Sequence, residues 1–194
     1  MATATVTVTG SLLAVLAIGT AVGQAHAQVS PPPAYQLAAQ QAGIPSTVLY
    51  AVALQESGIQ RNNRIVPWPW SLNVAGESRR FATRADACAG LHRALGEMPP
   101  TRVDAGLGQV NVGYHKHRYR YPCDLLDPYQ NLAIAAEILK EQHNPGEDWL
   151  LAIGRYHRPA GGAPAARYRR AVSRHLARVT SASEHSIASK PERP

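Results

Sequence analysis

Glycine and proline divide this chain into short helical segments, and their positions restrict the folds that it can adopt. Gly43 is placed to end a helix over 35–42, and Pro45 to open a second helix over 46–57. Gly58 follows as a suitable C-cap for the second helix. We therefore expect a mainly helical domain.

Further helices are predicted along the rest of the chain. Thr83, with Asp86 three residues later, gives a helix start similar to a capping box. Asp127 and Pro128 supply an N-cap and a first-turn proline. The predicted helices beyond residue 82 are 83–96, a short one within the glycine-rich segment 104–112, 127–142, 147–156 and an arginine-rich one that ends near Val179.

One segment, between Ile65 and Ala82, lacks the helical period. The turn-forming residues Ala75-Gly76-Glu77 lie in its middle, after an alternation of apolar residues that comprises Trp68, Trp70, Leu72 and Val74. This pattern predicts a small β-hairpin. The expected fold class is therefore mainly α, or α+β, with one small hairpin, in a single domain over 35–179.

The N-terminal segment is typical of an exported protein. Residues 1–27 contain no charged side chain, include an apolar stretch and end in Ala25-His26-Ala27, a form that signal peptidase accepts. We expect a signal peptide over 1–27 and a periplasmic protein, with an uncut inner-membrane anchor as the alternative. Residues 28–34 are expected to be a proline-rich spacer, and residues 180–194 a disordered tail.

The chain has two cysteines, Cys88 and Cys123, which suit an exported protein with one disulfide. Two unpaired buried thiols are the alternative. The sequence contains no CxxC pair, no HExxH and no phosphate-binding glycine loop, so redox, zinc and nucleotide chemistry have no basis in it. We expect no metal, no cofactor and a monomer.

The formal net charge of +7 predicts an anionic partner. An exported protein meets the anionic cell wall and lipid headgroups first, so we expect no specific nucleic acid. An exported nucleic-acid-binding module is an alternative that rests on the charge alone. The densest positive charge lies at Arg167, Arg169, Arg170, Arg174 and Arg178.

Glu56 is an acidic residue on an otherwise apolar helical face, shared with Leu49, Val52 and Ala53. Burial disfavours the charged form of a carboxyl group, and the negative end of the helix dipole acts in the same direction. Both effects raise the pKa of Glu56, which suits a general acid near neutral pH. A surface glutamate at a frayed helix end is the alternative.

Four sequence blocks occur in a characteristic order. They are Ala53-Leu54-Gln55-Glu56-Ser57-Gly58, Ala105-Gly106-Leu107-Gly108-Gln109-Val110-Asn111, Leu126-Asp127-Pro128-Tyr129-Gln130-Asn131-Leu132 and Ala152-Ile153-Gly154-Arg155-Tyr156-His157. With these blocks the chain resembles the soluble-lytic-transglycosylase-like domain of the lysozyme-like superfamily, over about 35–179. Two segments are also similar to small muramidases of conjugation and type IV secretion systems and of integrating conjugative elements: Trp68-Pro69-Trp70-Ser71-Leu72-Asn73-Val74 and Gly154-Arg155-Tyr156-His157.

The resemblance implies a lysozyme-like fold in which Glu56 corresponds to the family's catalytic glutamate. Two positions depart from the family pattern: Gly108 stands where methionine is usual, which removes an apolar wall from the groove, and His157 stands where asparagine is common. The positions that the resemblance places around the glycan or the catalytic carboxylate are Ser57, Gln109, Asn111, Asn131 and Tyr156.

The resemblance also implies an activity on peptidoglycan strands. The bond between N-acetylmuramic acid and N-acetylglucosamine would be cleaved with formation of a 1,6-anhydro sugar, and components of a conjugation or type IV secretion apparatus would be partners. Two alternatives stay open. One is a hydrolase similar to goose-type lysozyme, for which Asp104 is the first residue to suspect, and the other is a glycan-binding assembly factor of a secretion system.

Overall fold

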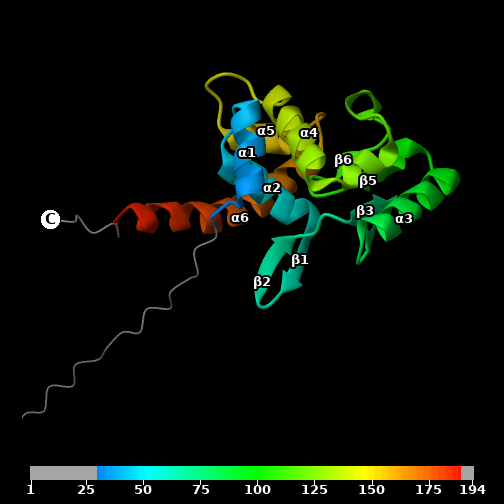
Figure 1. Cartoon of the computed structure of the whole chain (residues 1–194). Coiled ribbons are helices and arrows are strands. Elements are labelled where there is room, and N and C mark those ends of the chain that lie inside the picture. Colours follow the sequence, from blue (N-terminus) through cyan, green and yellow to red (C-terminus); the bar gives the residue numbers. More distant parts are fainter. Residues whose placement is uncertain (1–29, 189–194) are drawn as a thin grey trace, which may run out of the picture.

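The computed structural model describes residues 30–188 and shows a helical body with a small sheet at one side (Figure 1). The sheet and α3 lie on the side of the body opposite to the C-terminal end of α6. The helices are α1 (Pro33–Ala42), α2 (Ser46–Ser57), α3 (Arg84–Glu97), α4 (Pro128–Glu141), α5 (Trp149–His157) and α6 (Gly162–Ala188). The mainly α, α+β class predicted from the sequence is confirmed.

Helix α2 lies at the centre of the core. Its residues from Val48 to Leu54 are all buried, so the helix is enclosed on every side rather than along one face. The reason is that α1, α4 and α6 all pack against it. The sequence predicted an apolar stripe, and the fold instead makes α2 a central helix that carries Glu56 in its last turn.

Two separate antiparallel sheets follow α2. The predicted hairpin is present as β3 (Ser71–Val74) and β4 (Glu77–Arg80). It belongs to a four-stranded sheet of order β4-β3-β5-β6. A second hairpin, formed by β1 (Gly58–Arg61) and β2 (Arg64–Pro67), was not predicted.

The short helix predicted within 104–112 is wrong. This segment forms a hairpin of β5 (Val103–Ala105) and β6 (Val110–Asn111), and β5 also pairs with β3. The turn needs two left-handed backbone positions, Gly106 with φ of 83° and Gln109 with φ of 45°. The glycines therefore mark a tight turn between strands rather than the start of a helix.

Most predicted helix boundaries are confirmed by their capping groups. Gly43 ends α1 in the left-handed conformation. The Thr83 hydroxyl accepts a hydrogen bond from the Asp86 amide at the start of α3, and Asp127 caps α4 by accepting from two backbone amides. Gly58 at the end of α2 is extended instead, and it lacks room for a side chain because an added Cβ would lie 2.3 Å from the Leu54 carbonyl oxygen.

The C-terminal helix is longer than predicted. Its amphipathic pattern ends near Val179, but α6 continues to Ala188, so the tail expected over 180–194 is in part helical. The signal peptide predicted over 1–27 and the last residues of the tail lie outside the described residues. Between residues 30 and 188 no helix combines the length and the apolar character that crossing a membrane requires.

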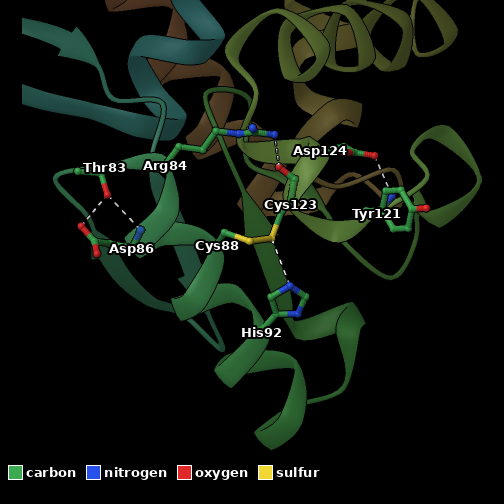
Figure 2. Close-up of a disulfide and its surroundings, with 8 residues drawn as sticks. All are labelled: Thr83, Arg84, Asp86, Cys88, His92, Tyr121, Cys123 and Asp124. Atoms are coloured by element: carbon green, nitrogen blue, oxygen red, sulfur yellow. Dashed lines mark hydrogen bonds between the residues drawn. A yellow bond between two sulfur atoms is a disulfide. The ribbon is translucent and has the colours of Figure 1, made fainter.

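The expected disulfide joins Cys88 of α3 to Cys123, in the 3-10 segment Pro122–Leu126 (Figure 2). The two Cα atoms lie 5.3 Å apart. The Arg84 side chain donates to the Cys123 carbonyl, which ties the same two segments together a second time. His92 approaches Cys123 Sγ at 3.4 Å, but each sulfur is committed to the disulfide and is not a free thiolate ligand.

Candidate active site

Glu56 lies where the helical body meets the four-stranded sheet. It is the penultimate residue of α2, and its side chain is partly buried. The Tyr168 hydroxyl of α6 donates a hydrogen bond to Glu56 Oε1 at 2.5 Å. The carboxyl group is therefore fixed by a side chain from the far end of the chain, 112 residues away in sequence.

The surroundings keep a proton on Glu56 near neutral pH. Burial is the main cause and raises the pKa of Glu56 from 4.5 to about 7. The hydrogen bond from Tyr168 acts against this, since it stabilises the carboxylate, and the negative charge of Asp104 raises the pKa further. A carboxyl group that exchanges its proton at about pH 7 can act both as an acid and as a base.

Asp104 brings a second carboxylate into electrostatic reach of Glu56. Asp104 lies on β5, and its side chain is partly buried. Its Oδ1 accepts a hydrogen bond of 2.8 Å from Asn111 Nδ2, whereas no described residue donates to Oδ2. Burial raises the pKa of Asp104, and the bond from Asn111 lowers it.

Tyr156 interacts electrostatically with both carboxyl groups, Glu56 and Asp104. Its hydroxyl donates to the Gly108 carbonyl at 2.6 Å. Burial raises its pKa well above the ordinary value, and the charges of Glu56 and Asp104 raise it further. Tyr156 is thus a neutral group that fixes the β5–β6 turn beside the carboxyl groups.

Gly108 has a different role from the one inferred from its departure from the family pattern. An added Cβ would lie 2.6 Å from Ala135 Cβ and 3.0 Å from the Tyr156 hydroxyl oxygen. These distances are too short for any side chain without rearrangement. Position 108 therefore faces the packed interior, and glycine allows the turn to approach α4 and Tyr156.

Ser57 and Asn131 are buried beneath the site and hold its backbone in place through hydrogen bonds. Both are 0% exposed. The Ser57 hydroxyl donates to the Leu107 carbonyl at 2.8 Å. Asn131 accepts from the Gly108 amide and donates to the carbonyl groups of Ala105 and Leu125. All polar atoms of Asn131 are used within the protein, so it holds the β5–β6 turn in place.

Gln109 and Asn111 differ in what they leave open. The Gln109 amide donates to the Gly106 carbonyl at 2.8 Å, and its Oε1 accepts no hydrogen bond from the described part of the chain. Asn111 uses Nδ2 for Asp104 and the Thr101 carbonyl, and Oδ1 for two backbone amides. Gln109 can therefore accept from a ligand, whereas Asn111 positions Asp104.

Sequence reasoning missed Tyr168. Tyr168, Val172, His175 and Val179 recur at helical spacing and are all buried. This apolar stripe packs α6 onto α2. The stripe could have been read from the sequence, but the contact with Glu56 depends on how α6 returns to α2.

The fold and the site together define a class. A helical body, a small antiparallel sheet and a proton-holding glutamate at their junction are the features of the lysozyme-like enzymes that cleave glycan strands.

The chain belongs to the Transglycosylase SLT domain family, which matches residues 33–177. Members of this family are peptidoglycan lytic transglycosylases, so the chain is an enzyme of this type and acts on the cell wall, outside the cytoplasm. No curated protein and no solved structure matched the chain.

Proposed function

We propose that Glu56 alone serves as acid and base in a cleavage that consumes no water. The bond cleaved is the β-1,4 bond between N-acetylmuramic acid and N-acetylglucosamine, and the product carries a 1,6-anhydro ring. The observation that carries the proposal is the position of Glu56: partly buried, bonded to Tyr168 and with a pKa of about 7.

The reaction balances without a cofactor. Protonated Glu56 gives its proton to the glycosidic oxygen as the bond from that oxygen to C1 of the muramic acid breaks. The carbonyl oxygen of the acetamido group stabilises the electron-poor C1. The C6 hydroxyl oxygen then bonds to C1, and its proton passes to the Glu56 carboxylate, which restores the starting state.

The neighbouring groups have distinct roles in this scheme. Tyr168 orients Glu56 and stabilises the carboxylate that exists between the two proton transfers. Gln109 offers its free Oε1 to a sugar hydroxyl or amide. Four residues act indirectly, because their hydrogen bonds fix the positions of α2, β5 and the β5–β6 turn: Ser57, Asn131, Asn111 and Tyr156.

Mass spectrometry of the fragments released from purified peptidoglycan tests the proposal. The protein should release muropeptides that are lighter than the hydrolysed forms by one water, and Glu56→Gln should release none. Gln differs from Glu by one group of similar size, so a folded but inactive variant assigns the chemistry to the proton. Release by a folded Glu56→Gln protein would exclude this role.

A hydrolase is the second candidate, and Asp104 is the observation that favours it. Glycosidases that use water place two carboxyl groups beside the bond. Asp104 is held by Asn111, keeps Oδ2 open and raises the pKa of Glu56. Fragments with hydrated reducing ends, lost in Asp104→Asn, would favour hydrolysis over transglycosylation.

We further infer that the protein is exported and opens the wall locally for a conjugation or secretion apparatus. The similarity of Trp68–Val74 and Gly154–His157 to muramidases of such machines supports this, and a disulfide suits an oxidising compartment. Deletion of the gene in a donor cell should lower the transfer frequency, and a Glu56→Gln copy should not restore it. Restoration by that copy would favour an assembly role.

A further inference from the structure

A shallow pocket lies beside the catalytic carboxyl group, where α2, α5 and α6 meet. It is linked to Glu56 through Tyr168, which lines the pocket and donates a hydrogen bond to the Glu56 carboxyl group. Tyr168 is the lining residue that has a role in the proposed reaction, and the other lining side chains have none. Its walls are formed by Gln55, His157, Pro164, Arg167, Tyr168 and Ala171.

One wall of the pocket is flat and fixed. The rings of His157 and Tyr168 stack with centroids 4.4 Å apart and an interplanar angle of 3°. Tyr168 is itself held by its bond to Glu56. A ligand in this pocket would therefore meet a preorganised ring that is itself bonded to Glu56.

Arg167 gives the pocket its charge. Burial and the charge of Arg158 lower the pKa of His157, so its ring is neutral at neutral pH, and Arg167 is the charged residue among those that form the walls. Arg167 is exposed and forms no ion pair or hydrogen bond with the described residues. A guanidinium group without a protein partner is available for an anion.

The remaining polar group fits the same ligand. The Gln55 carboxamide makes no hydrogen bond within residues 30–188 and can donate its amide hydrogens into the pocket. A guanidinium group forms two parallel hydrogen bonds with a carboxylate, and an amide can supply a third. The chemistry of the pocket therefore favours a carboxylate.

We propose that this pocket binds a carboxylate carried by the muramic acid side of the peptidoglycan strand, with Arg167 as its main contact. The inference rests on the proposed function and deepens it. Muramic acid bears a lactyl group whose carboxyl is either free or extended by a stem peptide that has carboxylates of its own, whereas N-acetylglucosamine has none. The pocket thus distinguishes the two sugars on either side of the cleaved bond.

Two variants and a matched control test the proposal. Arg167→Ala removes the charge, and Arg167→Lys keeps it without the planar fork. Arg170→Ala removes another exposed arginine of α6, one that does not line the pocket. Equal thermal midpoints for the four proteins would establish that none of these surface changes disturbs the fold.

Three ligands separate the possible carboxylates: peptidoglycan with its stem peptides, strands stripped of peptide by an amidase, and N-acetylglucosamine oligomers. Arg167→Ala should raise KM for the carboxylate-bearing strands about tenfold, equivalent to about 1.4 kcal/mol, with little change in kcat. Arg167→Lys should lose less. Inhibition by the oligomers should be the same in all four proteins.

The outcomes are distinct. A defect confined to the stripped strands identifies the free lactyl carboxylate, and a defect confined to peptide-bearing strands identifies a carboxylate of the stem peptide. A defect on both kinds of strand shows that the pocket binds either carboxylate. The proposal is overturned if Arg167→Ala behaves like Arg170→Ala on every ligand, or if it weakens the oligomers equally. If the wild-type protein cleaves nothing, the proposed function fails, and co-sedimentation of the same variants with peptidoglycan still decides whether Arg167 binds it.

Discussion

Replacement of Tyr168 by phenylalanine tests how the pKa of Glu56 is set. The Tyr168 hydroxyl lowers the pKa of Glu56, because it donates to the carboxylate at 2.5 Å. A hydrogen bond to a charged group contributes about 1.5 to 3 kcal/mol, and one pKa unit corresponds to about 1.4 kcal/mol. Loss of the hydroxyl should therefore raise the pKa of Glu56 above its value of about 7 by about one pH unit or more.

The assay is the pH dependence of kcat/KM for fragment release. Activity on the alkaline side falls as Glu56 loses its proton, so its midpoint should move upward in Tyr168→Phe, whatever the change in maximal rate. Tyr129→Phe, an exposed tyrosine of α4, is the control and should leave the midpoint in place. Asp104→Asn should move it downward, because the Asp104 charge raises the pKa of Glu56. An unchanged or lower midpoint in Tyr168→Phe would refute this reasoning.

Three further predictions concern stability. The pKa of Glu56 rises on folding from 4.5 to about 7, so its protonated form stabilises the fold below pH 4.5 and this contribution is lost as the pH rises through 7. Chemical denaturation should therefore show Glu56→Gln more stable than the wild type at pH 8, by up to about 3 kcal/mol, with no such gain at pH 4; an equal gain at both pH values would contradict the burial of Glu56. Gly108→Ala should cost about 1 to 3 kcal/mol through contact with Ala135, whereas Gly96→Ala in the open on α3 should be neutral or stabilising in the same assay. The double variant Cys88→Ser, Cys123→Ser should lose about 3 to 4 kcal/mol, since the disulfide closes a separation of 35 residues; a loss below about 1 kcal/mol would show that the loop is ordered without it.

The helices of the fold were predictable where local chemistry determines them. Gly43 requires a left-handed backbone, and Asp127 satisfies the free amides of a helix start, so the boundaries of α1 and α4 follow from neighbouring residues. The hairpin of β5 and β6 was mistaken for a helix because its strands are very short and are stabilised by pairing with β3, which is distant in sequence. The hairpin of β1 and β2 was not predicted from the sequence. Its turn holds Asn62 and Asn63, both with positive φ, and asparagine is a residue that tolerates this conformation.

The candidate site likewise has residues that local sequence identifies and residues that only the packing of distant segments brings in. Glu56 could be singled out because an acid on an apolar helix is expensive to bury, and this argument concerns α2 alone. Tyr168 could not be paired with it, because that contact joins two helices whose packing no local pattern determines. The burial of Asn131 and the crowding around Gly108 likewise appear only once α4 and the β5–β6 turn are in place.

The proton affinity of Glu56 decides whether this residue can act as the acid. The carboxyl carbon of Glu56 can be assigned by comparison with Glu56→Gln, and its NMR shift followed from pH 3 to pH 10 in the folded protein. We expect a single titration with a midpoint at about 7. A midpoint near 4.5, the ordinary value for a glutamate, would mean that the carboxyl group is ionised at neutral pH and cannot be the acid that begins the cleavage.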